Sequence, residues 1–308
     1  MSEHFADRLI AAIEKKSSPI CVGIDPMLEM FPPELVPSPA NCNDSAICVD
    51  AIFEFTTRIL KIVADHVPIV KFQSAYFEKY RGDGVEAYFS LIQEAKQLGL
   101  LVIGDVKRGD IGSTSAAYAD AHLASVQGDD TDEADTPDAI TVNPFCGLDT
   151  IEPFVRTARD ENKGLFVLVR TSNPGSAALQ DQKLVDGRTY SEMLANSLRP
   201  IADEAVGSSG YSCVGAVVGA TQTHTMSSIR QRLPKSIFLL PGYGTQGATG
   251  EMTRAAFTNG KGAIVSASRS ILYAHRETKY SGKFGKDWER CTLAAVEDMK
   301  RDVAQFIQ

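Results

Sequence analysis

Short apolar runs recur along the chain, and segments with a helical pattern lie between them. The runs are rich in β-branched residues and contain few polar positions. Such near-continuous hydrophobicity is typical of parallel strands that are covered on both faces. Eight runs fit this description, and we predict strands at Pro19–Asp25, Ile69–Gln73, Leu101–Lys107, Ala139–Pro144, Leu165–Thr171, Cys213–Ala220, Ile237–Tyr243 and Gly262–Arg269.

Helix-like segments separate the predicted strands. They include Ala51–Val63, Gly84–Leu98, Thr114–Val126 and Glu251–Asn259, the last with Gly260 as its C-cap. Eight successive strand-then-helix units in a chain of 308 residues indicate a (β/α)8 TIM barrel. A doubly wound open sheet is the alternative, but no G-x-G-x-x-G motif follows the first strand.

The predicted barrel accounts for the whole chain, residues 1–308, as a single α/β catalytic domain. Residues 1–16 have the pattern of an amphipathic N-terminal helix. Three polar segments are predicted to be loop insertions, near residues 27–46, 127–138 and 180–190. The second is acidic, but it lacks the glycine and the terminal glutamate of an EF-hand loop, so we expect a solvated loop rather than a calcium site.

Composition and charge narrow the possible partners. Hydrophobic residues at 44% and charged residues at 23% are ordinary for a globular protein, and the formal charge of −8 argues against a nucleic-acid partner. The N-terminal segment lacks the basic start and apolar centre of a signal peptide, and no stretch approaches the ~20 apolar residues of a membrane span. Six cysteines are scattered without a C-x-x-C pair. We therefore expect a cytoplasmic protein that binds neither membrane nor nucleic acid.

Polar residues gather at the carboxyl ends of the predicted strands, where barrel enzymes place their active sites. Asp105 and Lys107 lie two positions apart on one strand, so their side chains should point to the same side, toward the barrel mouth. We expect all these groups to converge on one rim. The candidates at or just beyond the strand ends are Asp25, Lys71, Asp105, Lys107, Asp110, Asn143, Thr171, Ser172, Asn173, Gln246, Ser268 and Arg269.

Lys107 stands between the carboxylates of Asp105 and Asp110 in the sequence. Nearby negative charge favours the ammonium form of a lysine. A charged lysine is a poor Schiff-base nucleophile, but it can donate a proton to a carbanion. A stabilising ion pair is the structural alternative, and the presence of Asp25 and Lys71 at the same rim favours catalysis.

Two segments near the end of the chain resemble a phosphate cradle. Gly242–Gly247 (GYGTQG) and Ser268–Ser270 (SRS) follow the last two predicted strands, which is where this fold binds phosphate. Arg269 can bind a phosphate through two parallel hydrogen bonds. The five histidines show no ligand spacing, so we expect a site without a metal or any other cofactor.

The segment Asp105–Thr114 reads D-x-K-x-x-D-I-x-x-T and is similar to the signature of the orotidine 5′-monophosphate decarboxylase family. The likeness is greatest to the longer branch found in many bacteria and some protists. It extends through GID at Asp25, VKFQ at Lys71, VNPF at Asn143, RTSNPGS, LPGYGTQG and SASRSIL. The resemblance implies a cofactor-free carboxy-lyase that converts orotidine 5′-monophosphate (OMP) to UMP and carbon dioxide in de novo pyrimidine biosynthesis.

The resemblance also implies catalytic roles for particular side chains. Asp25 and Lys71 would hold the ribose hydroxyls, and Asp105 would crowd the substrate carboxylate. Lys107 would protonate C6 as carbon dioxide leaves. Asp110 would act in the neighbouring subunit's site, so that a homodimer shares its active sites.

Further residues would bind the substrate on the same resemblance. Ile111 and Thr114 would accompany Asp110 into the neighbouring site, and Ser172 would contact the pyrimidine edge. Gln246 and Arg269 would bind the phosphate. Asn143 is a candidate through its position at a strand end alone.

Two other functions remain as alternatives at this point. A barrel lyase of the hexulose-phosphate synthase type shares the D-x-K-x-x-D strand, but its magnesium-bound enediolate needs additional carboxylates at neighbouring strand ends. A non-catalytic nucleotide-binding barrel is the other alternative, although it would not require the charged Asp-Lys-Asp set.

Overall fold

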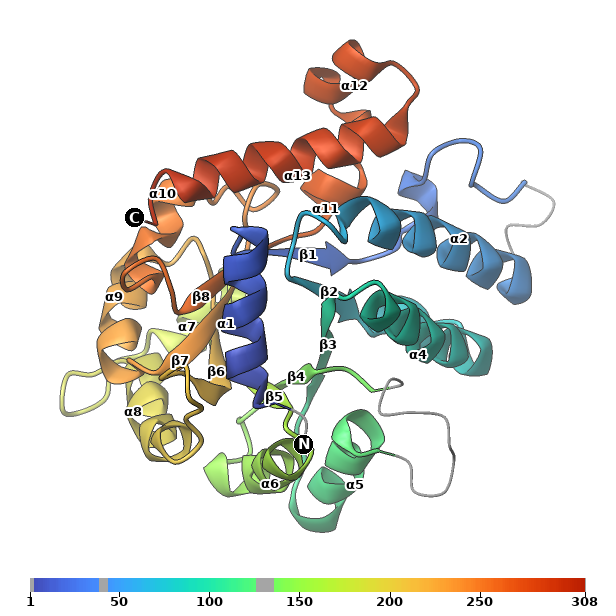
Figure 1. Cartoon of the computed structure of the whole chain (residues 1–308). Coiled ribbons are helices and arrows are strands. Elements are labelled where there is room, and N and C mark those ends of the chain that lie inside the picture. Colours follow the sequence, from blue (N-terminus) through green and yellow to red (C-terminus); the bar gives the residue numbers. More distant parts are fainter. Residues whose placement is uncertain (1–2, 39–43, 126–135, 308) are drawn as a thin grey trace.

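The computed structural model describes residues 3–38, 44–125 and 136–307. Within these residues, eight parallel strands pair in chain order, and β1 also pairs with β8, which closes the barrel (Figure 1). The predicted (β/α)8 TIM barrel is therefore confirmed. The strands are β1 (Ile20–Ile24), β2 (Ile69–Gln73), β3 (Leu101–Arg108), β4 (Ala139–Val142), β5 (Gly164–Arg170), β6 (Ser212–Val218), β7 (Ser236–Pro241) and β8 (Ala263–Ala267).

Helices surround the barrel, and the long α13 runs along one side of it (Figure 1). Short 3-10 turns η1 to η5 connect some of them. The helices are α1 (Phe5–Lys16), α2 (Ser45–Val63), α3 (Ala75–Glu78), α4 (Arg81–Gln97), α5 (Gly112–Leu123), α6 (Glu152–Asp160), α7 (Ala177–Gln180), α8 (Tyr190–Asp203), α9 (Thr223–Arg232), α10 (Gly250–Thr253), α11 (Arg269–Leu272), α12 (Thr278–Phe284) and α13 (Trp288–Ala304). The 3-10 turns are η1 (Leu28–Met30), η2 (Leu148–Ile151), η3 (Pro174–Ser176), η4 (Arg254–Ala256) and η5 (Ala274–Arg276).

The predicted strands agree with the structure to within two residues at each end, and the predicted helices Gly84–Leu98 and Thr114–Val126 correspond to α4 and α5, although Val126 itself lies outside the described residues. The predicted helix Ala51–Val63 ends where α2 ends, but α2 begins earlier, at Ser45. The prediction of a helix over Glu251–Asn259 is wrong, because α10 ends at Thr253 and a 3-10 turn follows it. Gly260 does not cap a helix. It lies, with φ of +74°, in a tight turn between the bridged residues Thr258 and Lys261.

The described parts of the predicted insertions lie outside the barrel strands. Residues 39–43 of the first and 127–135 of the second lie outside the described residues. In the first, Asp44 caps α2 through its side chain, and the backbone amides of Ala46 and Ile47 donate to its carboxylate. The third ends in a capping box at Thr189, which starts α8. Polar residues in these segments thus start the helices that follow.

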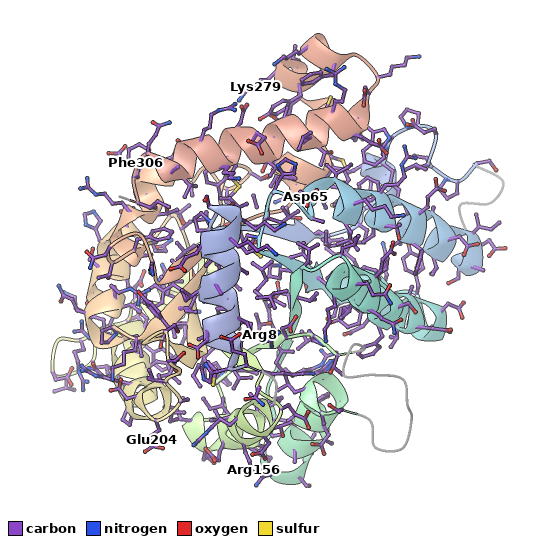
Figure 2. The ribbon with its side chains drawn as sticks, viewed as in Figure 1. Arg8, Asp65, Arg156, Glu204, Lys279 and Phe306 are labelled. Carbon is purple, nitrogen blue, oxygen red and sulfur yellow. The ribbon has the colours of Figure 1, made fainter. Side chains whose placement is uncertain are left out.

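Helix α1 lies across the end of the barrel where the strands begin (Figure 1). Phe5 packs edge-to-face on Phe166 of β5, with ring centroids 6.1 Å apart. A Cβ on Gly164 would lie only 2.2 Å from the Phe5 ring, so this close approach requires glycine. Arg8, labelled in Figure 2, pairs with the buried Asp138 at 2.6 Å. This end of the barrel is therefore sealed, which leaves the opposite mouth for chemistry.

Candidate active site

Asp105 is the centre of a buried charge network at the barrel mouth. Its Oδ2 accepts hydrogen bonds from Lys71 Nζ at 2.8 Å and from Gln73 Nε2 at 3.0 Å. Its Oδ1 accepts from Lys107 Nζ at 2.5 Å and from Thr141 Oγ1 at 2.8 Å. The donors come from β2, β3 and β4, so barrel closure brings together side chains that are distant in sequence.

The two lysines keep Asp105 ionised. Burial alone would raise the pKa of this carboxyl, but the charges of Lys71 and Lys107 outweigh burial and hold the pKa well below its usual range. Burial would likewise lower the pKa of Lys71, and the carboxylates of Asp105 and Asp25 raise it above its ordinary value instead. Asp105 and Lys71 therefore favour each other's charged forms inside the barrel.

Lys107 differs from Lys71 in its access to the cavity. The side chain of Lys71 is 9% exposed, whereas that of Lys107 is 44% exposed. The backbone of Lys107 adopts φ of +47°, a left-handed conformation that is uncommon outside glycine. The pairing of β3 with β4 shifts register between Gly104 and Arg108, around this residue. The side chains of Asp105 and Lys107 do meet, as strand alternation predicted, although the strand is irregular at that point.

Asp25 follows β1 and is fixed through its backbone. Its carbonyl accepts a hydrogen bond from the Tyr273 hydroxyl at 2.8 Å, and the same hydroxyl accepts one from the Met27 amide at 2.7 Å. Among the described residues, the buried Oδ1 of Asp25 has no hydrogen-bond partner. A buried carboxylate oxygen of this kind is available to accept hydrogen bonds from a ligand.

These groups line a cavity of about 390 Å³. Six of the predicted site residues face it, namely Asp25, Lys71, Asp105, Lys107, Ser172 and Gln246. Thr171 and Asn173, collected with Ser172 at the end of the fifth predicted strand, also line it. Two polar residues of the lining, Gln73 and Thr141, were not predicted, and neither were the residues that supply apolar surface, Leu168, Val217, Leu239 and Pro241. A mixed lining with a few convergent polar groups is typical of a small-molecule site.

The loop after β5 carries Ser172 and is closed by a buried arginine. Arg170 donates through Nε and Nη2 to the two carboxylate oxygens of Asp181, both at 2.8 Å. The Thr171 amide donates to Gln180 Oε1 at 2.8 Å. A Cβ on Gly219 would lie 2.9 Å from Ser172 Cα, so the neighbouring strand end must be glycine. Ser172 is therefore held on a rigid loop over the cavity.

The glycine-rich loop after β7 leaves little space for a side chain at Gly242 and Gly244. Gly242, Gly244 and Gly247 all have positive φ values. A Cβ on Gly242 would lie 3.0 Å from Gln246 Oε1, and one on Gly244 would lie 2.8 Å from Ser270 Oγ. The loop therefore lets backbone approach a ligand closely, next to polar side chains.

Arg269 begins α11, directly after β8, and is exposed. The hydroxyls of the adjacent Ser268 and Ser270 are buried and have no partner among the described residues. The first amides of any helix also lack partners within that helix. Hydroxyls, amides and a guanidinium together favour a phosphate-sized anion.

Several predicted residues do not line the cavity of their own chain. Three of them, Asp110, Ile111 and Thr114, follow β3; the Ile111 side chain is 64% exposed, and Asp110 Oδ1 accepts from the Ile111 amide at 2.8 Å. Asn143 Oδ1 accepts from the Phe145 amide at 3.0 Å, and Asn143 lines a separate cavity of about 170 Å³. Arg269 lies on the rim.

The described lining of the cavity combines lysine, carboxylate, hydroxyl and amide groups with apolar side chains, and the guanidinium of Arg269 lies on the rim. Across residues 3–38, 44–125 and 136–307, no three His, Cys, Asp or Glu side chains are grouped so as to hold a metal ion. Over the same ranges, no helix has the length and apolar character that crossing a membrane requires.

Comparison with known proteins places this arrangement in a family. The model of the orotidine 5′-phosphate decarboxylase / HUMPS family matches residues 18–282. An orotidine 5′-phosphate decarboxylase of Rhodopirellula baltica is 40% identical over 301 residues, covering 97% of this chain and 98% of its own length. The orotidine 5′-phosphate decarboxylase of Clostridium novyi is 35% identical, with the same coverage of both chains.

Solved structures agree with the sequence relatives. The structure of Leishmania donovani OMP decarboxylase superposes with a TM-score of 0.73 at 25% identity, covering 98% of each chain. The family match spans most of the barrel, and the relatives align over nearly their whole length. The chain belongs to the orotidine 5′-phosphate decarboxylase / HUMPS family, as the D-x-K-x-x-D-I-x-x-T resemblance predicted.

Proposed function

We propose that the chain is a single-domain orotidine 5′-phosphate decarboxylase in which Lys107 protonates C6 of the pyrimidine. The activity is that of the relatives, which match it over nearly their whole length at 35–40% identity. The observation that carries the mechanism is the Lys71–Asp105–Lys107 network at the mouth of the cavity. It places a fixed carboxylate beside a partly exposed ammonium.

The chemistry follows from the charges. The bond between C6 and the substrate carboxylate breaks, carbon dioxide leaves, and the electron pair stays on C6. The Lys107 ammonium stabilises this developing charge and transfers one proton to C6. The neutral amine then regains a proton from water. Asp105 holds Lys107 in place through the 2.5 Å contact, and its negative charge disfavours the substrate carboxylate relative to the products.

The rest of the cavity would bind the remainder of OMP. Asp25 and Lys71 would hold the ribose hydroxyls. Both line the cavity, and the buried Asp25 Oδ1, which has no partner in the described structure, could accept a hydrogen bond from a hydroxyl. Ser172 would contact the pyrimidine edge from its rigid loop. Gln246 and Arg269 would bind the phosphate, whose binding energy orients the ring without taking part in bond breaking.

The same proposal includes a homodimer with shared active sites. Asp110, Ile111 and Thr114 do not face the cavity of their own chain. Ile111 and Phe145, in the loops after β3 and β4, are large apolar residues that are 64% and 70% exposed. Burial of these side chains by a second copy would direct Asp110 and Thr114 into the partner's cavity.

The proposal also places the enzyme in the cytoplasm, where pyrimidine nucleotides are made. The buried Cys21 and Cys213 are free thiols, which suits a reducing compartment.

Incubation of the purified protein with OMP tests the function directly. We expect the absorbance of OMP to decay to that of UMP, with one carbon dioxide released for each UMP formed. The result should be the same in the presence and absence of EDTA. Loss of activity with EDTA and its recovery with magnesium would favour the hexulose-phosphate synthase type. Binding of OMP without turnover would favour a non-catalytic nucleotide-binding barrel.

A further inference from the structure

Thr141 lies on β4 and contacts both members of the Asp105–Lys107 pair. Its Oγ1 donates to Asp105 Oδ1 at 2.8 Å and accepts from the backbone amide of Lys107 at 3.0 Å. The side chain is 1% exposed. The Thr141 hydroxyl therefore bridges the Asp105 carboxylate and the main chain of Lys107.

The direction of both hydrogen bonds is determined by the partners. An ionised carboxylate can only accept, and a backbone N–H can only donate. The Thr141 hydroxyl hydrogen must consequently point at Asp105, with an oxygen lone pair directed to Lys107. No other orientation of the Thr141 hydroxyl satisfies both the Asp105 carboxylate and the Lys107 amide.

The contact lies at the irregular part of β3. Lys107 has φ of +47°, and the register between β3 and β4 shifts between Gly104 and Arg108. At this irregularity the Lys107 amide donates to a side chain, Thr141 Oγ1, at 3.0 Å. A strained backbone persists only where its surroundings over-determine it, and here the acceptor is Thr141 Oγ1.

We infer that Thr141 is a positioning residue for the reaction: its hydroxyl holds the Lys107 backbone in the left-handed conformation and fixes Asp105 beside it. This inference rests on the proposed function, since it acts through the Asp105–Lys107 pair. It assigns to β4 a part in catalysis that the charged residues of β2 and β3 do not supply. Without the hydroxyl, Lys107 Nζ would sample positions away from C6.

The experiment compares Thr141→Val, which keeps the side-chain shape without the hydroxyl, with Thr141→Ser, which keeps the hydroxyl. Ser236→Ala is the control for loss of a buried barrel hydroxyl. Ser236 begins β7 at the opposite end of the barrel, and its Oγ donates to the Val214 carbonyl at 2.8 Å. For each variant we would measure kcat and KM for OMP, UMP affinity, and hydrogen exchange of the Lys107 amide.

We expect Thr141→Val to lower kcat by about 10- to 100-fold, the range for losing a hydrogen bond to a charged group, with KM and UMP affinity within about threefold of wild type. Its Lys107 amide should exchange faster. Thr141→Ser and Ser236→Ala should retain wild-type kcat within about threefold and wild-type exchange at Lys107. If Thr141→Val does not fold, Thr141→Ala removes the same hydroxyl without a buried methyl in its place.

Three results would overturn the inference. They are a kcat of Thr141→Val close to wild type, a Thr141→Ser variant as slow as Thr141→Val, or unchanged exchange of the Lys107 amide. The exchange measurement requires no substrate. An inactive wild-type protein would therefore count against the proposed function, while the exchange data would still test the role of Thr141.

Discussion

Asp105 receives four hydrogen bonds from three strands, and two of the donors are ammonium groups. A carboxylate bound in this way cannot move toward the substrate or away from it. Its charge therefore acts at a fixed position, which is the condition for electrostatic preorganisation. Lys107 is the member of the network with most exposure to the cavity, so it is the one that can reach a ligand.

Replacing Lys107 by alanine should remove the proton donor while leaving the phosphate loop intact. We expect kcat to fall by several orders of magnitude, beyond the ~10²–10⁴ of general acid catalysis, because charge stabilisation is lost as well. UMP should still bind within about tenfold, or ~1.4 kcal/mol. Steady-state kinetics and UMP titration measure both quantities, with Lys15→Ala on the exposed face of α1 as control. Turnover near the wild-type rate would exclude Lys107 from the mechanism.

Arg269 lies on the rim, so its contribution should depend on the substrate phosphate. Arg269→Ala should lose about 1.5–3 kcal/mol of charge-assisted hydrogen bonding, or roughly 10–150-fold in kcat/KM for OMP. The loss should nearly disappear for orotidine, which has no phosphate. Measuring kcat/KM for both substrates checks this expectation, and equal losses for the two would place Arg269 outside the phosphate site.

Most of the network could be predicted from the sequence because charged residues at strand ends are conspicuous. Gln73 and Thr141 were missed because uncharged polar residues are common in strands. Alternation could have found Gln73, which lies two positions after Lys71. It was no guide to Thr141, because the nearest predicted site residue on that strand, Asn143, lines a separate cavity. The left-handed backbone of Lys107 could not be predicted, because it arises from the register shift between β3 and β4.

At the level of elements, the strands were predictable and the helix after β7 was not. A strand that is covered on both faces is apolar along most of its length, and this leaves a clear pattern in the sequence. The segment from Glu251 to Asn259 has a helical pattern, but Asp302 of α13 accepts hydrogen bonds from the Gly250 amide and the Tyr243 hydroxyl, both at 2.8 Å. These tertiary contacts fix where α10 begins, and the chain turns away after Thr253. Such contacts are not visible in local sequence.

Helix α1 is attached to the barrel by a carboxylate whose effect depends on pH. Asp7 Oδ2 accepts from the Ser208 amide at 2.9 Å, and its Oδ1 accepts from the Ser209 amide at 2.7 Å. Burial alone would raise the pKa of Asp7, but the hydrogen bonds from Ser209 and Ser208 outweigh it and lower the pKa to about 2. Because the folded-state pKa lies below the unfolded one, the stabilisation is present above about pH 4 and is lost as pH falls toward 2.

Asp7→Asn should therefore lower the free energy of unfolding by about 1–2 kcal/mol at pH 7. The difference from wild type should narrow steadily between pH 4 and pH 2. Urea unfolding of both proteins across this range measures it. Asp65→Asn is the matched control, because the Asp65 side chain is 95% exposed and its contact with Lys16 is 3.7 Å long, so it should change stability little. A difference for Asp7→Asn that is constant down to pH 2 would contradict the linkage.

At the scale of the whole molecule, barrel closure brings most of the site residues to one cavity, but it leaves one segment of the sequence motif outside that cavity. The cavity takes residues from strands β1 to β7, which are far apart in the sequence. The segment from Asp110 to Thr114 is part of the same sequence motif, yet it lies outside that cavity. The separation of the two halves of the motif is explained if Asp110 to Thr114 contribute to the active site of another subunit. This explanation can be tested without a structure of the dimer.

If each site takes Lys107 from one chain and Asp110 from its partner, neither Lys107→Ala nor Asp110→Ala homodimers should work well. Mixing equal amounts of the two variants under conditions that exchange subunits makes half of the dimers mixed. Each mixed dimer has one site that lacks both groups and one site with both intact. Random pairing in a two-fold dimer therefore restores about a quarter of the wild-type sites.

The gain is measured as OMP turnover after exchange, and native mass spectrometry proves that the subunits have mixed. A site built within one chain allows no such rescue, because every site would keep one lesion, so activity that stays at the level of the two parents would exclude a shared site.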